Sequence, residues 1–355
     1  MSTQGPLFLR ADPPTDPHDA RRTNRSRVLH SLIMHGPASR AELSRRLGLS
    51  RPTISVIANE LLTSGVLAEG DRISSGGAPG TLLEMAKDGA MTIVADLAVP
   101  RRLRMAAVAI NGEVVTHHMV EVDEAVDALP AIVAFAERLE PDSALGVVLA
   151  VPDWVGPNGE WAGRSGHATD AELAPSLRQR LRKPVFAVNA VDAMTVADMR
   201  DSPADRSALA SIVVAEQIGI GLVLNGRLFA TRQPGEGDLT HIAPGTPGPT
   251  CPECGRMCLR RQVMALGTGL KPEARESAAA ALAAVTAPVI ATVGLQEVVL
   301  AGLPGAFADD LADRTRAGLA LRLPAERVPV VRASRRGPDA VMLGAAALML
   351  FRHLG

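Results

Sequence analysis

The sequence predicts an α/β protein with an N-terminal winged helix-turn-helix and a larger, two-lobed α/β body. One observation is a series of capped helical patterns followed by a hairpin pattern before about residue 86. A second is that strands and helices alternate after about residue 90, in two similar blocks that each open with a hairpin. Such a duplication indicates a cleft between lobes, where ligands usually bind. We expect a flexible arm over residues 1–21, the winged helix-turn-helix over 22–86 and the body over 87–355.

The first helix is predicted by apolar periodicity. Residues 1–20 are rich in proline and aspartate and show no period, so we interpret them as a weakly ordered arm. From Asn24 onward apolar residues recur at helical spacing, and the pair Gly36-Pro37 stops the pattern.

A helix-turn-helix and a wing follow. Ser39 and Glu42 have the spacing of a capping box at the start of a second helix, which ends at Gly48. Ser50 caps a third helix, where Pro52 in the first turn needs no N–H partner. This helix is expected to bury Ile54, Ile57, Leu61 and Leu62 and to expose Arg51, Thr53, Ser55 and Asn59. The strand patterns around Leu67-Ala68 and Thr81–Leu83 predict a hairpin wing with Ser75-Gly76-Gly77 at its tip.

Charge is concentrated in the helix-turn-helix. The chain has 37 Lys plus Arg against 38 Asp plus Glu, a net charge of −1, which by itself argues against a polyanion-binding protein. Between Arg21 and Pro52, however, eight arginines accompany one acid, Glu42, so this segment carries +7 and the remainder about −8. A solvated helical face is the alternative interpretation. Because the charge coincides with a capped helix-turn-helix and a wing, we favour contact with DNA phosphates.

Composition restricts the remaining classes of protein. Hydrophobic residues make up 47% and charged residues 21%, which is the ordinary globular range. No run of about 18 apolar residues occurs, and the N-terminus has no apolar stretch after a basic start. We therefore expect a cytoplasmic protein without a membrane segment.

The body is predicted to contain two hairpins, each closed by an Asn-Gly pair, Asn111-Gly112 and Asn225-Gly226. The expected strands are 91–98, 105–110, 113–115, 145–151, 184–188, 211–214 and 221–224. The expected helices are 128–139, 170–181, 193–200, 273–282 and 340–350.

The three cysteines, Cys251, Cys254 and Cys258, lie within eight residues. They cannot form a disulfide framework, and clustering of this kind favours a metal site. Three buried thiols without a metal are the alternative.

The order of these motifs resembles the ROK family (repressors, open reading frames and kinases). The resemblance is carried by ASRAELSRRLGLSRPTISVIANELLTSGVL, the wing segment SSGGAP, PVFAVNAVDA, IGIGLVLNGRL, His241 nine residues before Cys251, and a terminal LGAAAL. It covers roughly residues 22–355 and implies a DNA-binding domain fused to an actin-like, sugar-kinase-type body.

The resemblance also implies that kinase chemistry has been lost. Family kinases carry an Asp-Gly-Gly-Thr phosphate loop, where this chain reads Asp96-Leu97-Ala98-Val99-Pro100. Their catalytic base is the Asp of an Asn-Asp pair, which here is Asn189-Ala190, and Asp192 should point elsewhere if a helix begins there. A third glycine-rich stretch is reduced to Ala301-Gly302-Leu303. We expect no phosphoryl transfer; a carbohydrate kinase with an appended DNA-binding domain is the alternative.

The family also implies zinc and a sugar. Its zinc ligands match His241, Cys251, Cys254 and Cys258, a closed and therefore structural set over 241–258, although the spacing C-x2-C-G-x2-C departs from the usual C-x-C-G-x2-G-C. Its sugar-binding positions correspond to Asn189, Asp238, His241 and Arg260. Ala190 and Arg260 replace family carboxylates, so Arg260 either meets an anionic sugar or is a solvated residue beside a vestigial pocket.

The expected function is sequence-specific transcriptional regulation, as a repressor of carbohydrate-related genes. The expected DNA contacts are Ser39, Arg40, Arg51, Pro52, Thr53, Ser55, Asn59, Ser75, Gly76 and Gly77, with Arg51 the best candidate for reading a base. A homodimer or homotetramer on a palindromic operator is expected, with a sugar or phosphosugar effector. A body that serves only oligomerisation is a further alternative, under which no small molecule changes DNA affinity.

Overall fold

The computed structural model describes residues 17–73, 80–87, 90–122, 125–139, 143–156, 159, 161, 168–203, 207–215, 217–229, 233–264, 272–303 and 305–354. Two compact units are present: Met1–Val188 with Met342–Gly355, and Asn189–Val341. The wing tip expected at Ser75-Gly76-Gly77 and the first sixteen residues lie outside the described residues.

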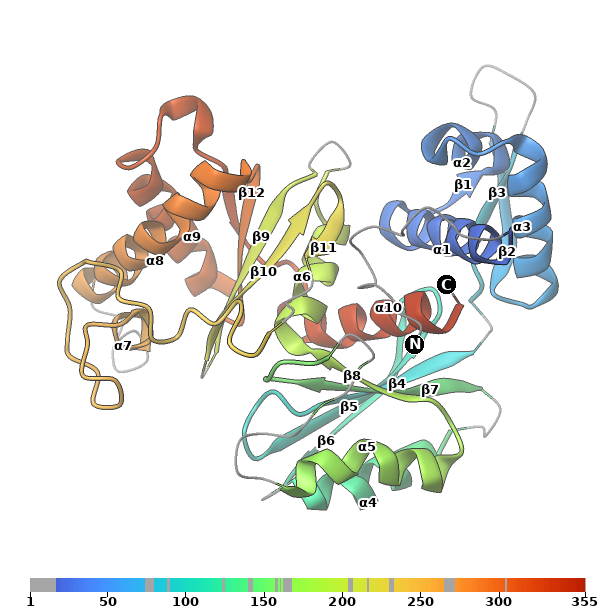
Figure 1. Cartoon of the computed structure of the whole chain (residues 1–355), viewed down its shortest axis with the longest axis horizontal. Helices are drawn as coiled ribbons and strands as arrows, with labels where there is room; N and C mark the ends of the chain where they lie inside the picture. The colour runs from blue at the N-terminus through green and yellow to red at the C-terminus, as the bar shows by residue number, and fades with distance from the viewer. Residues whose placement is uncertain are drawn as a thin grey trace. The chain divides into compact units, whose positions relative to one another are not determined.

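The N-terminal domain is a winged helix-turn-helix (Figure 1). Its helices are α1 (Pro17–His35), α2 (Arg40–Leu47) and α3 (Arg51–Thr63), and its strands are β1 (Ala38–Ser39), β2 (Leu67–Ile73) and β3 (Gly80–Met85). The strands form a sheet in the order β1-β3-β2, with both neighbouring pairs antiparallel. The expected buried face of α3 is correct at Ile54, Ile57 and Leu61, whereas Leu62 is only partly buried.

Helix α1 begins earlier than its periodicity predicts. It starts at Pro17 rather than Asn24, so residues 17–21 of the expected arm are helical. Proline is tolerated in a first turn, because its missing N–H would have no intrahelical partner there. Arg21 also forms an ion pair with Glu60 of α3, which anchors this extra turn to the domain.

The first body sheet has the strand order β6-β5-β4-β7-β8. Its strands are β4 (Met91–Asp96), β5 (Arg102–Ala109), β6 (Val114–Glu121), β7 (Ala144–Val151) and β8 (Val185–Asn189). The first three form an antiparallel meander, and β7 pairs parallel to β4. Helices α4 (Ala125–Ala136) and α5 (Ala168–Leu181) lie side by side on one face of it (Figure 1).

The second body sheet repeats this order as β11-β10-β9-β12-β13. Its strands are β9 (Leu209–Val214), β10 (Ile218–Leu224), β11 (Arg227–Phe229), β12 (Glu297–Ala301) and β13 (Val330–Ala333). Its first three strands form the same antiparallel meander, and β12 pairs parallel to β9 as β7 does to β4. β13 pairs parallel to β12. The predicted duplicated α/β body is therefore confirmed, although β12, β13 and two helices, α7 (Leu259–Met264) and α9 (Gly305–Ala320), were not predicted.

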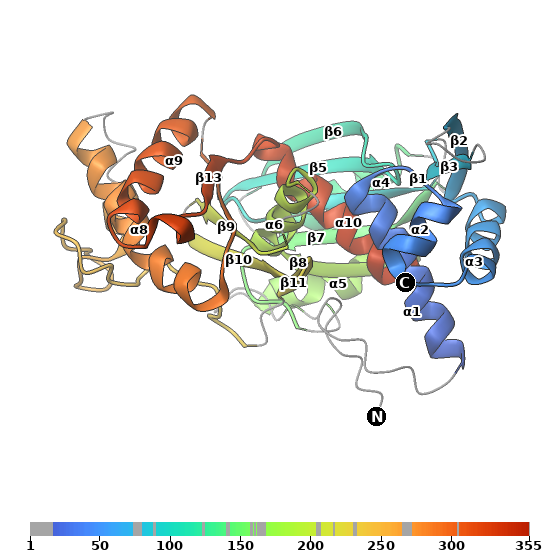
Figure 2. The same cartoon turned by 90° about the horizontal axis from the view of Figure 1, so that it is seen from above.

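The last helix of each block packs in the opposite unit. α6 (Ala190–Arg200) follows β8 but belongs to the second unit, and α10 (Ala340–Leu354) follows β13 but belongs, from Met342 on, to the first. The side chains of α10 are buried from Val341 to Phe351. At its end the Phe351 ring lies 5.2 Å from the ring of His30 on α1, and Figure 2 shows the two helices together.

The two Asn-Gly turns differ in conformation. Asn225 and Gly226 both have positive φ, 54° and 68°, as a type I′ turn requires, and they join β10 to β11. At the first hairpin Gly112 has φ 88° but Asn111 does not share the left-handed region, and Gly112 N donates to Ala109 O at 2.9 Å. The Asn-Gly pair is typical of a two-residue type I′ turn, and that expectation is wrong at Asn111-Gly112, where the hairpin has a longer loop that ends in a left-handed glycine.

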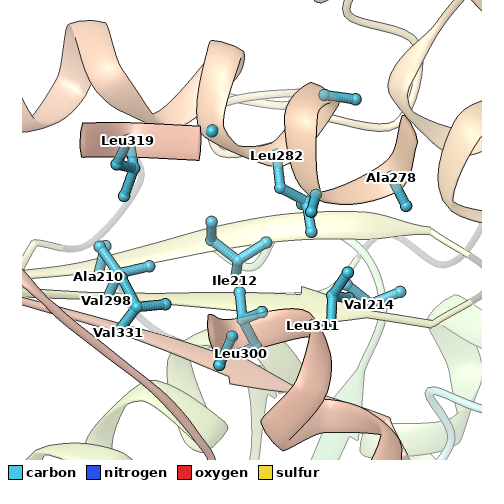
Figure 3. Close-up of a cluster of buried hydrophobic side chains, with 14 of the residues drawn as sticks. Ala210, Ile212, Val214, Ala278, Leu282, Val298, Leu300, Leu311, Leu319 and Val331 are labelled. Carbon is cyan, nitrogen blue, oxygen red and sulfur yellow. The ribbon is translucent and has the colours of Figure 1, made fainter. Parts of the chain in front are cut away.

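The core of the second unit lies between its sheet and α8 (Pro272–Val293) with α9. Figure 3 shows alternate residues of β9, Ala210, Ile212 and Val214, facing helix residues such as Leu282 and Leu319. Among the described residues α8 is the one helix long and apolar enough to cross a membrane by length and composition. Core helices share that property, and Ala278, Ala281 and Leu282 are fully buried here.

Candidate nucleic-acid interface and metal centre

Helix α3 presents a polar outer face with a fixed start. Ser50 Oγ accepts from Thr53 N at 3.2 Å, and the Ser50 and Thr53 hydroxyls lie 2.8 Å apart. Arg51, Pro52 and Asn59 are exposed, while Thr53 and Ser55 are partly buried. Pro52, Ser55 and Asn59 lie on the side of the helix away from the buried residues, and Arg51 and Thr53 lie at the two edges of that side in the first turn.

Val56 was missed by the sequence analysis. It belongs to the outer face of α3, and 52% of its surface is exposed. The sequence signal for Val56 was a β-branched apolar residue at a position that the helical period places among polar residues. Its methyl groups are suited to apolar contact with a thymine methyl in a major groove.

The Ser39 half of the expected capping box forms at the start of helix α2, whereas the Glu42 carboxylate accepts from Arg46 Nη2 at 2.8 Å. Ser39 Oγ accepts from Glu42 N at 3.2 Å, and Gly48 ends the helix in the left-handed conformation with φ 65°. Arg40 does not extend freely from this start, because its guanidinium lies 3.3 Å from the carboxylate of Glu69 on β2 and 3.4 Å from Asn59 Oδ1. Arg40 thus joins α2, α3 and the wing.

Several of the clustered arginines serve the domain internally. Arg27 donates to Leu47 O, Arg46 pairs with Glu42 at 2.8 Å, and Arg21 pairs with Glu60. Residues 22–86 as a whole, which leave out Arg21 and add Arg72, contain eight arginines and five acids. The excess positive charge is thus smaller than the +7 of residues 21–52, and Arg45 and Arg51 are among its exposed contributors.

The four predicted metal ligands come together in the second unit. Ligand atoms of His241, Cys251, Cys254 and Cys258 all lie within 4.8 Å of one another. Cys251 and Cys258 are buried. His241 Nδ1 is buried and has no hydrogen-bond partner among the described residues, as expected of a nitrogen that binds a metal. The donor set of three thiols and one imidazole suits a tetrahedral metal ion.

The cysteine loop is built by a tight turn. Gly255, with φ 68°, donates to Cys251 O at 2.9 Å, and Cys251 N donates to Arg256 O at 2.8 Å. The backbone amide of Cys254 donates to the Cys251 sulfur and lowers the pKa of that thiol, which favours the thiolate that a metal requires. Burial raises the pKa of Cys258.

The predicted effector residues lie on segments that flank the start of β10 or follow from it. Asn189 caps α6, its Oδ1 accepting from Val191 N at 2.8 Å. A Cβ on Gly219 would lie 2.6 Å from Cγ2 of Val191, and Gly219 bridges Asp238, so α6 and the 238–242 segment flank the same glycine.

Arg260 and His241 complete this group. Arg260 N donates to Thr240 O at 3.0 Å, and Thr240 N donates to Asp238 Oδ1 at 2.8 Å. The Arg260 guanidinium pairs with Glu253, whose Oε2 lies 3.4 Å from His241 Nε2. The sequence analysis did not single out Glu253, although its place inside the cysteine loop was visible.

Two family profiles match this chain: the MarR family at residues 16–72 and the ROK family at residues 101–272. The chain carries a MarR-type helix-turn-helix and a ROK domain. It is 23% identical over 254 residues to the xylose repressor of Bacillus subtilis (strain 168). The match covers 66% of this chain and 64% of the repressor, which is less than two thirds of the repressor's length. It is 29% identical over 192 residues to the N-acetylmannosamine kinase of Salmonella paratyphi B (strain ATCC BAA-1250 / SPB7), 46% of this chain and 64% of the kinase.

The ROK fold is also seen in the solved structures. A crystal structure of a ROK family transcriptional regulator, a homologue of the E. coli MLC protein, matches 94% of this chain and 98% of its own, with a TM-score of 0.71 and 22% identity. It confirms the combination of a winged helix-turn-helix with a two-lobed, actin-like body.

The segment that the sequence analysis compared with a phosphate loop contains an internal ion pair. Asp96, at the end of β4, is 1% exposed and accepts from Arg104 Nε at 2.9 Å. Its other oxygen accepts from Ala98 N at 2.9 Å. Ala190, which the resemblance places where family kinases have their base, is the first residue of α6. Burial raises the pKa of Asp192, two residues later, to about 7.

Proposed function

We propose that this ROK protein is a sequence-specific DNA-binding repressor of carbohydrate-related genes, whose kinase-like body binds a carbohydrate without phosphorylating it. The observation that carries the proposal is the capped helix α3, with Arg51 and Asn59 exposed on its outer face, fused to a ROK body. The similarity to a xylose repressor supports the same function.

In this proposal α3 lies in the major groove. Arg51 pairs with a guanine edge, and Pro52, Thr53, Ser55, Val56 and Asn59 form the rest of the contact surface. Ser39 and Arg40 face the phosphate backbone of the DNA. To contact a phosphate, Arg40 gives up its ion pair with Glu69. The wing tip, Ser75, Gly76 and Gly77, contacts the backbone or the minor groove. Because α1 begins at Pro17, the proposed domain bounds are 17–86 for DNA binding and 87–355 for the body.

The body is proposed to lack phosphoryl transfer. Arg104 neutralises Asp96 where a phosphate loop would need glycines, and Ala190 has no group that accepts a proton. The similarity to a kinase makes this worth testing directly.

The proposed effector is a neutral sugar, held by Asn189 and Asp238 beside the metal-bound His241. Arg260 was the reason to consider an anionic sugar, but its charge is already paired with Glu253. An anion would have to displace that carboxylate, at the cost of leaving it unpaired. The similarity to a xylose repressor favours a sugar without a phosphate group.

The metal is proposed to be a structural zinc ion held by His241, Cys251, Cys254 and Cys258. Three thiolates and one imidazole close a tetrahedral site and leave no position for a reactive water. Bound zinc would hold the 238–242 segment against the cysteine loop. The proposed assembly is a cytoplasmic homodimer or homotetramer on a palindromic operator.

The test starts from random duplexes. Selection by the full-length protein should enrich a palindrome, and fluorescence anisotropy should then show a log–log salt slope of about −0.9 for each phosphate contacted. Adding pentoses or hexoses should weaken binding, while phosphorylated hexoses should not. A coupled ATP-consumption assay with the same sugars should stay at background. Failure to enrich any sequence, or a salt slope near zero, contradicts the proposed function.

A further inference from the structure

The carboxylate of Glu253 lies between two groups of the metal centre. Its Oε2 is 3.4 Å from His241 Nε2, and it accepts a hydrogen bond from Arg260 Nη1. The His241, Glu253 and Arg260 side chains are 38%, 54% and 23% exposed, so Glu253 is the most exposed of the three and its two partners are more buried.

The two nitrogens of His241 have different surroundings. Nε2 faces Glu253, whereas Nδ1 is buried without a hydrogen-bond partner among the described residues. A neutral imidazole carries one proton, and a carboxylate beside Nε2 favours the tautomer with the proton on Nε2. The lone pair then lies on Nδ1, which is the nitrogen available to join the three sulfurs.

We propose that Glu253 and Arg260 are positioning residues for the zinc ligand His241: Glu253 orients the imidazole through Nε2–H, and Arg260 holds Glu253 in place. This inference rests on the zinc proposal and is independent of DNA binding. A carboxylate behind a metal-bound histidine raises the basicity of the ligand and fixes its ring. Arg260 is thereby part of the metal centre rather than the receptor for an anionic effector.

Charge explains why the pair occurs together. Zinc with three thiolates and a neutral imidazole has a net charge of −1, so an additional carboxylate nearby would be repelled. The guanidinium of Arg260 offsets that repulsion through a charge-assisted hydrogen bond. Two residues separate Cys251 from Cys254 where the usual ROK spacing has one, and Glu253 is one of the two. Arg260, two residues after Cys258, replaces a family carboxylate. Both departures from the ROK pattern thus supply a member of the Glu253–Arg260 pair.

The test measures metal affinity of the full-length protein by competition with a chromophoric chelator, using Zn²⁺ and Co²⁺. Glu253→Gln and Arg260→Gln should each weaken binding about 10–100-fold, while the Co²⁺ spectrum should keep the bands of three sulfurs and one nitrogen. Arg261→Gln, on an exposed neighbour in α7, and Glu273→Gln, on the exposed first turn of α8, are matched controls and should bind as wild type does.

A double mutant separates positioning from general damage. Because Arg260 acts through Glu253, adding Arg260→Gln to Glu253→Gln should cause little further loss of affinity. Nitrogen NMR of the Zn²⁺-loaded protein should show His241 protonated at Nε2. Three results would each overturn the positioning role of Glu253 and Arg260. They are a metal affinity of Glu253→Gln within twofold of wild type, additive losses of affinity in the double mutant, and a proton on Nδ1 of His241. A wild-type protein that binds no Zn²⁺ instead overturns the zinc proposal.

Discussion

The guanidinium of Arg332 on β13 donates to the carboxylate of Glu297, the first residue of the neighbouring strand β12. The Glu297 side chain is 0% exposed and that of Arg332 is 14% exposed. Arg332 Nη2 also donates to Asp198 O at 3.1 Å, so the pair connects the sheet of the second unit to α6.

Removing one member of this pair should destabilise the second unit strongly. We expect Arg332→Ala to lower the free energy of unfolding by about 3–5 kcal/mol, because it leaves a carboxylate buried without its countercharge. Urea denaturation measures the loss. Arg322→Ala, on an exposed side chain at the end of α9, should change it by about 0.5 kcal/mol or less. Equal stability of the two variants would contradict a structural role for the pair.

Asp198 should make stability depend on pH. Its carboxylate is fully buried and accepts from Ser334 Oγ at 2.6 Å and from Ser211 Oγ at 2.9 Å. Burial raises its pKa above the ordinary value of 3.8, although its two serine hydrogen bonds and Arg332 oppose the shift. At a pH between the ordinary pKa of the unfolded chain and the raised pKa of the folded chain, Asp198 keeps its proton only in the folded chain. The free energy of unfolding therefore falls as the pH rises between these two pKa values.

Asp198→Asn should therefore flatten the fall in stability above about pH 4, since an amide has no proton to release. Unfolding midpoints measured at a series of pH values from 4 to 8 report the slope. Asp313→Asn, on an exposed residue of α9, should keep the wild-type slope. A slope in Asp198→Asn that equals that of the wild type would refute the prediction.

Gly48 should be required for the turn between α2 and α3. Its φ of 65° is left-handed, and no atom lies within 4 Å of a Cβ built there, so strain alone opposes a side chain. We expect Gly48→Ala to destabilise the N-terminal domain by about 1–2 kcal/mol, and Gly48→Asn by less. Thermal unfolding and hydrogen exchange of α2 amides measure both. Equal losses in the two variants would argue against a conformational cause.

Removing the metal should loosen the second unit. We expect chelation of the purified protein to release about one equivalent of zinc and to lower the melting temperature, which added Zn²⁺ restores. Cys254→Ser should weaken binding of the metal, since a hydroxyl is a poorer ligand than a thiolate. No change in melting temperature after complete removal of zinc would show that the ion is dispensable for stability.

Arg51 should read a base. We expect Arg51→Ala to weaken operator binding by about 1–3 kcal/mol and to relax preference at one base pair, because the lost contact is bidentate. Anisotropy titrations against the operator and its single-base variants measure both effects. Arg327→Ala, an exposed substitution in the body, is the control. A uniform loss across all sequences with a salt slope reduced by about 1 would instead place Arg51 on a phosphate.

Local patterns were enough for the helix-turn-helix. Capping at Ser39 and Ser50 and the left-handed Gly48 depend on residues three or four apart, which a sequence displays directly. The four metal ligands were predictable as residue types for the same reason, since three of them lie in one short loop. By contrast Glu297, Asp198 and Arg332 are far apart in sequence, and nothing local marks them as partners.

The amino-acid pattern therefore determined which segments form helices and strands, where the cysteines gather and which face of α3 is polar. Tertiary structure alone decided which units α6 and α10 join, because an apolar helix face specifies that it is buried but not against which sheet. It also decided that Arg260 meets Glu253. A side chain's charge is visible in the sequence, whereas its partner depends on how the cysteine loop folds back onto α7.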